Sequence, residues 1–241
     1  MFGKNAVTAP VYRKDGHLRV KEIFYTLQGE GPRAGQPAIF VRLAGCNLRC
    51  YFCDTDFEGG ELLPPEEVRA RIADAEPRCR LVVLTGGEPL AQQIIPLVAD
   101  LWQECGITTQ VETAGTCAPP PAPSGRTLEA LVAQGALEIV CSPKTPKLHP
   151  EIMRHCRHYK YIVRAGELAE DGLPNRATQH ENKPQMLYRP GPGDIVYLQP
   201  QDEPNDLTRK RSRANRAAAV AACLEHGYRL SLQQHKIVGV P

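Results

Sequence analysis

Residues 81–104 read LVVLTGGEPLAQQIIPLVADLWQE, and this stretch decides the fold. It begins with the apolar run Leu81 to Leu84, which has the composition of a buried strand, and it ends with Ala91 to Glu104, which has helical spacing. Between the two, Gly86 and Gly87 allow the backbone to approach a ligand closely. A strand that leads through glycines into a helix is one unit of a parallel sheet. Open sheets of this class bind ligands where their strands end.

The same alternation extends in both directions from this unit. Runs typical of strands are Val20–Thr26, Ala38–Leu43, Leu81–Thr85, Thr109–Glu112, Leu137–Cys141, Tyr159–Val163, Ile195–Gln199 and Arg229–Leu232. Segments with helical spacing are Pro65–Ala75, Ala91–Glu104, Leu128–Gln134, Pro150–Arg157 and Thr208–His226. The alternation predicts an α/β fold with mostly parallel strands. In the last helix we expect Val220 and Leu224, backed by Ala217 and Ala221, to form the apolar stripe.

The composition is that of an ordinary globular protein, with 42% hydrophobic residues and a formal net charge of +2. We expect one domain over residues 1–241, with a polar insertion at about 165–193 that lacks the apolar residues for a second core. The polar start has no signal-peptide core, and no stretch of about 18 apolar residues occurs, so we expect a cytoplasmic protein without a membrane span. The near-neutral charge argues against nucleic acid as a partner, and the basic run 209–216 is expected to be a solvated helix face.

Three cysteines occur within eight residues, as CNLRCYFC over 46–53. Thiolates at Cys46, Cys50 and Cys53 can converge from one loop on one inorganic centre. A structural zinc ion or a closed cluster takes a fourth ligand, but the next cysteine, Cys79, follows 26 residues after Cys53. Three ligands leave one metal position open, which favours a [4Fe–4S] cluster that binds S-adenosylmethionine. A three-cysteine zinc site is the alternative.

Polar residues follow three successive predicted strands. Glu88 comes after the first and is suited to accept hydrogen bonds from an ammonium group, ETAGT at 112–116 closes the second, and Ser142-Pro143-Lys144 follows the third. Such strand ends meet along one rim, where barrels and part-barrels build their sites. Arg42 lies in an otherwise apolar strand, which costs stability unless the charge is paired. It therefore indicates either an anionic ligand or a buried ion pair.

Together these motifs resemble those of the 7-carboxy-7-deazaguanine synthase family, within the radical S-adenosylmethionine superfamily. The superfamily pattern is the cysteine triplet with Gly86-Gly87-Glu88-Pro89. The family pattern adds FYTLQGEG at 24–31, Asp54-Thr55, ETAGT at 112–116, Ser142-Pro143-Lys144 and the ending QHK at 234–236. These pieces extend from Phe24 to the end of the chain.

The resemblance implies an abbreviated (β/α) partial barrel that is homodimeric. It implies a ring contraction of 6-carboxy-5,6,7,8-tetrahydropterin to 7-carboxy-7-deazaguanine with loss of ammonia, on the route to queuosine and other 7-deazapurines. The adenosyl radical takes a hydrogen from the pterin C6, and the hydrogen is later returned, so S-adenosylmethionine acts catalytically. Mg²⁺ is also implied, at Thr55, together with an electron donor such as flavodoxin. Oxygen ligands are those that Mg²⁺ prefers.

Carried over by motif, the resemblance also assigns site residues. Those implied to contact substrate are Leu27, Gln28, Gly29, Arg42 and Thr85. Those implied to bind S-adenosylmethionine are Phe52, Cys53, Asp54, Gly87, Glu88, Ser142, Pro143 and Lys144, with Gln199, Pro200, Gln201 and Asp202 from a further strand end.

The end of the chain adds one more candidate. We expect the apolar residues Ile237, Val238 and Val240 to pack against the body and to hold the α-carboxylate of Pro241 near the rim. A pterin presents adjacent N–H donors, which a carboxylate can accept in bidentate fashion. We therefore predict that the carboxylate of Pro241 is a substrate ligand.

Two other functions remain open at this point. One is a different radical enzyme with the same cofactors, such as a glycyl-radical activase or a peptide-modifying enzyme. Gln28, Glu30 and Arg42 argue against it, because they suit a small substrate. The other is a non-catalytic iron–sulfur or zinc module, which would need a fourth protein ligand.

Overall fold

The computed structural model describes residues 5–53, 55–179, 183–203 and 205–241. Its strands are β1 Leu18–Leu27, β2 Pro37–Leu43, β3 Glu61–Leu63, β4 Leu81–Gly86, β5 Thr108–Thr113, β6 Leu137–Cys141, β7 His158–Val163, β8 Ile195–Pro200 and β9 Arg229–Leu230. Its α-helices are α1 Pro65–Ala75, α2 Ile95–Cys105, α3 Leu128–Ala133, α4 Pro150–His155, α5 Lys210–His226 and α6 Gln234–Val238, and two 3₁₀ turns are η1 Gly31–Arg33 and η2 Pro89–Ala91.

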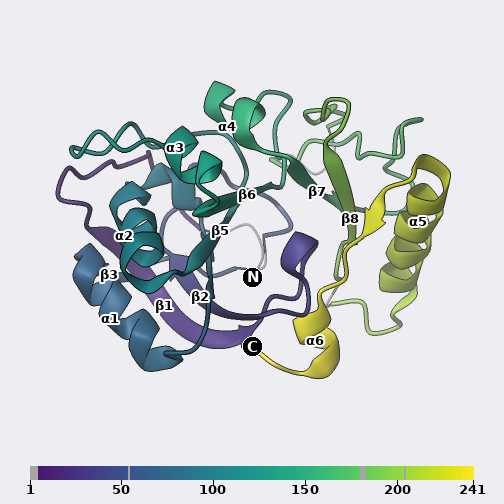
Figure 1. The fold of residues 1–241 in the computed structure, drawn as a ribbon. Helices are drawn as coiled ribbons and strands as arrows, with labels where there is room; N and C mark the ends of the chain where they lie inside the picture. Colours follow the sequence, from purple (N-terminus) through teal and green to yellow (C-terminus); the bar gives the residue numbers. More distant parts are fainter. Residues whose placement is uncertain (1–4, 54, 180–182, 204) are drawn as a thin grey trace.

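Within the described residues the nine strands form one sheet, in the order β3-β1-β2-β4-β5-β6-β7-β8-β9. β1 pairs antiparallel with β2 and β3, and every pair from β2–β4 to β8–β9 is parallel. The two edge strands β3 and β9 do not pair, so the sheet curves without closing (Figure 1). The predicted α/β fold with mostly parallel strands in a partial barrel is confirmed.

Side chains alternate between the two faces of the sheet, because successive residues of a strand point to opposite sides. In β7, Tyr159 and Tyr161 are fully buried against the helices, whereas Lys160 and Ile162 point to the inner face. The outer face carries the core, which joins the strands to α1, α2, α3, α4 and α5. Figure 1 shows these helices on the outer side of the curved sheet. The inner face is thereby left for polar groups.

The predicted elements are all present, with small differences at their ends. α2 begins at Ile95 rather than Ala91, because Pro89–Ala91 forms the 3₁₀ turn η2 and Pro96 occupies the first turn, where proline is favoured. It ends at Cys105 and is capped by Gly106, whose φ of 63° suits a left-handed cap. The short strand β3 and the five-residue helix α6 are not predicted by the sequence.

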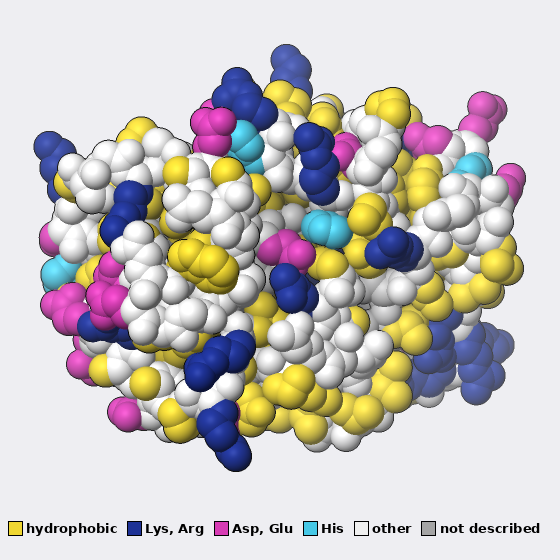
Figure 2. Space-filling model, in the orientation of Figure 1, with side chains coloured by type: hydrophobic (Ala, Val, Ile, Leu, Met, Phe, Trp, Pro, Cys, Tyr) yellow, Lys and Arg dark blue, Asp and Glu magenta, His cyan; other side chains and the backbone are white. Residues whose placement is uncertain are grey.

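The predicted buried stripe of α5 is wrong. Val220 and Leu224 are 40% and 83% exposed, whereas Ala219 and Ala222 are buried against the sheet. Small alanines allow the helix to lie close to β8, and this close packing outweighs the larger apolar side chains. The basic run is exposed as expected, and Lys and Arg side chains gather over the start of α5 at the lower right of Figure 2.

The segment 165–193 is described except for residues 180–182 and lies against the main body. Leu173 and Leu187 are buried in the main core, so the segment has more apolar anchoring than the sequence suggested. Two isolated bridges, Leu168 with Pro174 and Arg176 with Pro184, tie it to itself. Among the described residues, the search for a helix that could cross a membrane finds none.

Candidate active site

The inner face and the carboxyl ends of the strands surround a cavity of about 1180 Å³. Sites for one small ligand have roughly 300–1,000 Å³, so this cavity has room for a cofactor and a substrate together. The predicted site residues that line it are Leu27, Gln28, Arg42, Cys46, Cys50, Phe52, Cys53, Thr55, Thr85, Gly87, Ser142, Lys144, Gln199, Pro200, Gln201, Asp202 and Pro241. Residues from seven separated stretches of sequence are thus brought to one place.

Four predicted residues are not among those that line the cavity in the described structure. Gly29 packs against His235, and a Cβ added to Gly29 would lie 2.2 Å from Nδ1 of that histidine. Glu88 is fully buried, and Pro143 lines a small neighbouring pocket. Asp54 lies outside the described residues.

The three clustered cysteines are free thiols, and all three face the cavity. Among the described residues, no three His, Cys, Asp or Glu side chains lie close enough together to hold a single metal ion. The three thiols that line the cavity fit a [4Fe–4S] cluster, because each cysteine thiolate can bind a different iron.

The glycine pair after β4 brings its loop onto the cysteine loop. The N–H of Gly87 donates to Leu43 O at 3.0 Å, and the N–H of Glu88 donates to Gly45 O at 2.9 Å. A Cβ on Gly87 would lie 1.8 Å from Gly45 O, and Gly86 has φ of 116°, so only glycine fits this approach. The glycines thus set the spacing between the loop after β4 and Cys46.

Glu88 supports this loop from behind. Its carboxylate accepts hydrogen bonds from the N–H groups of Leu90 at 3.0 Å and Ala114 at 2.8 Å and from the hydroxyl of Thr113 at 2.7 Å. Burial raises the pKa of Glu88, and these three donors oppose that rise. Glu88 therefore joins the end of β4 to the end of β5.

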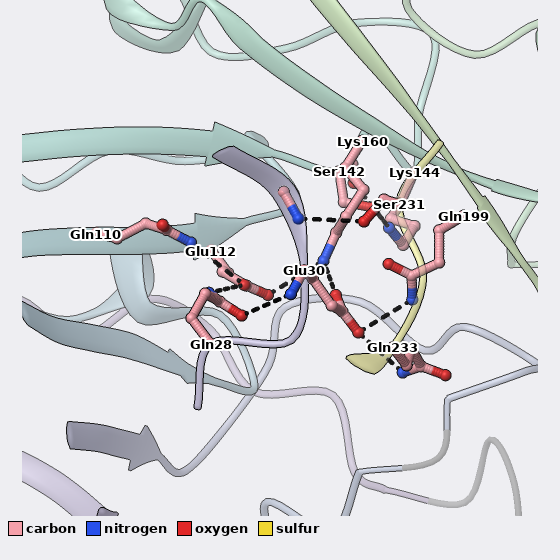
Figure 3. Close-up of polar contacts among 11 residues, drawn as sticks. Gln28, Glu30, Gln110, Glu112, Ser142, Lys144, Lys160, Gln199, Ser231 and Gln233 are labelled. Atoms are coloured by element: carbon pink, nitrogen blue, oxygen red, sulfur yellow. Dashed lines mark hydrogen bonds and ion pairs between the residues drawn. The ribbon is translucent and has the colours of Figure 1, made fainter. Parts of the chain in front are cut away.

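A buried network of charges and amides forms part of the wall of the same cavity (Figure 3). Lys160 of β7 contacts the carboxylates of Glu30 and Glu112, with its Nζ 3.3 Å from Glu112 Oε2. Gln28 donates to Glu112 at 2.9 Å. Two further amides, Gln199 and Gln233, donate to Glu30 at 3.1 and 2.8 Å.

The charges of this network stabilise one another. Burial opposes ionisation of Glu30, but Lys160 and the amide of Gln233 lower its pKa below the ordinary value. Burial likewise disfavours the charged form of Lys160, but Glu112 and Glu30 raise its pKa above the ordinary value. Glu30 and Lys160 are therefore both ionised at neutral pH and present fixed charges to whatever occupies the cavity.

Sequence reasoning missed Lys160 and Gln233 as site residues. The signal for Lys160 was available, because a lysine among the apolar residues of a strand needs a partner just as Arg42 does. Gln233 precedes the unpredicted helix α6 and gave no such signal. His235, in that helix, packs on Gly29, and burial lowers its pKa.

Arg42 has a protein partner. Its Nε lies 2.5 Å from Glu22 Oε1, and its guanidinium lies 5.7 Å from the centre of the Phe24 ring. The pair is partly exposed rather than buried, since the Glu22 side chain is 50% exposed. Of the two expectations, the ion pair is present, and Arg42 still faces the cavity.

The chain end reaches the cavity by a different route from the one expected. Ile237, Val238 and Val240 are 69%, 60% and 36% exposed, so the prediction that they pack against the body is wrong. Polar contacts hold the segment instead, because the five-residue helix α6 buries none of its side chains. Gln234 N–H donates to Gly29 O at 3.1 Å, and the Thr26 hydroxyl donates to an oxygen of Pro241 at 2.7 Å.

Comparisons with known proteins identify the family of the chain. The model of the Radical SAM superfamily matches residues 41–180. The 7-carboxy-7-deazaguanine synthase of Rhodospirillum rubrum is 44% identical over 245 residues, which cover 100% of both chains. The protein of the same name from Rickettsia prowazekii is 32% identical over 251 residues, covering 100% of this chain and 96% of its own.

A solved structure supports the fold. The crystal structure of QueE from Escherichia coli matches with a TM-score of 0.59 at 24% identity, over 90% of this chain and 93% of that one. Fold, cysteine triplet and full-length sequence similarity lead to one assignment. The chain belongs to the 7-carboxy-7-deazaguanine synthase family of the Radical SAM superfamily.

Proposed function

We propose that this protein converts 6-carboxy-5,6,7,8-tetrahydropterin to 7-carboxy-7-deazaguanine with loss of ammonia, in the biosynthesis of queuosine or related 7-deazapurines. The observation that carries the proposal is a single cavity lined both by the three cysteines and by the Glu30–Lys160–Glu112 network. A cluster and a small polar heterocycle would thus lie within reach of one another. Similarity to named synthases over the whole chain supports the same activity.

The cofactors would be held by the cysteine loop and the neighbouring strand ends. Cys46, Cys50 and Cys53 would bind the [4Fe–4S] cluster, which together with S-adenosylmethionine supplies the adenosyl radical. Ser142 and Lys144 after β6 face the cavity beside the cysteine loop, and Lys144 donates to the Ser142 carbonyl at 2.8 Å. These groups, with Phe52, Gly87 and residues 199–202, would orient S-adenosylmethionine.

The substrate would lie against the Glu30–Lys160–Glu112 network. Leu27, Arg42 and Thr85 also line the cavity, and the amide of Gln28 is fixed by its bond to Glu112. A pterin ring carries N–H donors and carbonyl acceptors, which the oriented amides and carboxylates of this wall can match. Gly29 would act indirectly, because its lack of a side chain allows His235 and the end of the chain to pack against it.

Pro241 would contribute its α-carboxylate to the same wall. Pro241 lines the cavity, and Thr26 holds one of its oxygens at 2.7 Å. A hydrogen bond to a charged group contributes about 1.5–3 kcal/mol, so displacing the carboxylate should raise the Michaelis constant for the pterin roughly tenfold or more. Appending one glycine after Pro241 tests this. An unchanged Michaelis constant for the pterin would show that the carboxylate of Pro241 does not bind the substrate.

Three further features follow from the family. Mg²⁺ would bind at Thr55, which lines the cavity two residues after Cys53. The protein would work in the cytoplasm as a homodimer, and an electron donor such as flavodoxin would reduce the cluster. Light scattering of the purified protein and the rate of cluster reduction by flavodoxin test the last two.

The proposed activity is tested by anaerobic incubation of cluster-loaded protein with reductant, S-adenosylmethionine, Mg²⁺ and 6-carboxytetrahydropterin. Mass spectrometry should detect 7-carboxy-7-deazaguanine, with many molecules of product formed for each molecule of S-adenosylmethionine consumed. A tetrahydropterin without the 6-carboxylate is the matched control and should give no product. Cluster-loaded protein that cleaves S-adenosylmethionine but leaves the carboxypterin unchanged would refute the assignment.

A further inference from the structure

The segment 165–193 reaches across the molecule to the cysteine loop. Thr178 and Gln179 lie beside Cys50, 128 and 129 residues further along the chain. The N–H of Tyr51 donates to Thr178 O at 3.0 Å, and the N–H of Arg49 donates to Gln179 Oε1 at 2.8 Å. The backbone on both sides of Cys50 is thus fixed by two consecutive residues of the segment.

The side-chain amide of Gln179 is oriented by these contacts. Because Oε1 accepts from the Arg49 N–H, the amide nitrogen must point the other way. Nε2 lies 3.3 Å from Cys50 Sγ and 2.9 Å from Thr178 Oγ1. One of its two N–H groups therefore donates to the sulfur.

Thr178 cannot take over this donor role. Its hydroxyl donates to Lys144 O at 2.9 Å and accepts from Gln179, so its one proton is used. The remaining contact between Thr178 and Cys50, at 3.7 Å, needs a thiol proton on Cys50. A Cys50 that binds iron is a thiolate and has lost that proton, so the amide of Gln179 remains as the donor among these groups.

We propose that Gln179 sets the reduction potential of the iron–sulfur cluster by donating a hydrogen bond to the Cys50 thiolate. Hydrogen bonds to cluster sulfurs are one of the factors that determine cluster potentials. Reduction adds negative charge to the cluster, and an N–H donor stabilises the reduced form more than the oxidised form. Gln179 is a positioning and tuning residue, and its role rests on the cluster alone and not on the pterin reaction.

The same contacts join the cysteine loop to the loop that follows β6. Thr178 binds the Lys144 carbonyl, and Lys144 faces the cavity. The segment thus acts as a clamp on both loops, which gives the long connection between β7 and β8 a function.

The test is a redox titration of reconstituted protein, followed by electron paramagnetic resonance without S-adenosylmethionine or pterin. Gln179→Leu removes the donor, and Gln185→Leu makes the same change at an exposed position of the same segment. At the midpoint potential of the parent, the ratio of reduced to oxidised cluster should fall about fivefold in Gln179→Leu. This is less than the full strength of a hydrogen bond to a charged group, because the bond forms in both oxidation states and only the difference in its strength changes the potential. It should stay unchanged in Gln185→Leu.

A second variant covers the case in which Gln179→Leu does not retain iron. Gln179→Glu keeps an acceptor for the Arg49 N–H but donates nothing to Cys50, and Gln185→Glu controls for the added charge. The potential should fall further in Gln179→Glu than in Gln185→Glu. Equal potentials of that pair, or an unchanged potential in an iron-loaded Gln179→Leu, would overturn the proposal. Because no pterin is present, neither result depends on the proposed activity.

Discussion

Replacing Lys160 with methionine tests the network in the cavity wall. The Lys160 side chain is 6% exposed and lies between Glu30 and Glu112. Methionine keeps most of the volume but removes the charge, so two carboxylates remain in one buried site. Glu30 keeps the amides of Gln199 and Gln233, and Glu112 keeps that of Gln28.

The loss of stability can be worked out from these contacts. Removing one partner of a buried ion pair costs about 3–5 kcal/mol. The remaining amides place Lys160→Met at the lower end, about 3 kcal/mol, which corresponds to a fall in Tm of roughly 6–12 °C for a chain of this size.

The pH dependence of stability provides an independent test of the same network. In the parent, the lowered pKa of Glu30 makes its contribution complete above its ordinary value of 4.5 and lost as the pH falls through the folded pKa. The raised pKa of Lys160 makes its contribution complete below 10.5 and lost as the pH rises through the folded pKa. Without the lysine, burial and like charge raise a carboxyl pKa, so the deficit of Lys160→Met should shrink from pH 7 to pH 5.

The assay is anaerobic thermal unfolding at pH 5, 6 and 7. Lys147→Met, at an exposed lysine, is the control and should leave Tm unchanged. Adding Glu30→Gln to Lys160→Met should recover part of the loss, because one of the two unpaired carboxylates is then neutral. A Tm equal to the parent, or a deficit that is the same at all three pH values, would refute the reasoning.

Three further predictions concern other parts of the site. Cys50→Ala should abolish both iron binding and turnover, as measured by iron content and product formation. Full activity of the variant would contradict the assignment of Cys50 as a cluster ligand. Thr55→Val should lower turnover and flatten its dependence on Mg²⁺, and if Mg²⁺ stimulates the variant as it does the parent, another group binds the ion. Asn215→Ala removes bonds to the Ala165 N–H at 2.9 Å and the Gln201 carbonyl at 3.0 Å. It should therefore lower the free energy of unfolding, measured by chemical denaturation, by about 2 kcal/mol. Asn205→Ala, at an exposed position, should leave this free energy unchanged.

The order of strands and helices could be predicted because it depends on local patterns. Apolar runs and glycine turns, as in residues 81–104, identify each unit without knowledge of its neighbours. The buried face of α5 could not be predicted in the same way. Its helix carries alanines on several sides, and only the fit against β8 selects Ala219 and Ala222 over Val220 and Leu224.

The motif residues at strand ends were also predictable, since parallel strands deliver their ends to one rim. The contacts between distant segments were not. The amide of Gln179 reaches Cys50 across 129 residues, and Thr26 reaches Pro241 across 215. Such pairs involve ordinary polar side chains, and nothing in their local sequence indicates the partner.

In the proposed reaction, one cavity brings the adenosyl radical to the pterin C6. Incubation of the cluster-loaded protein with 6-carboxytetrahydropterin deuterated at C6 measures this directly, with mass spectrometry of both product and S-adenosylmethionine. We expect 7-carboxy-7-deazaguanine to form while deuterium passes into the 5′ position of S-adenosylmethionine. Product formation with S-adenosylmethionine free of deuterium would contradict the account.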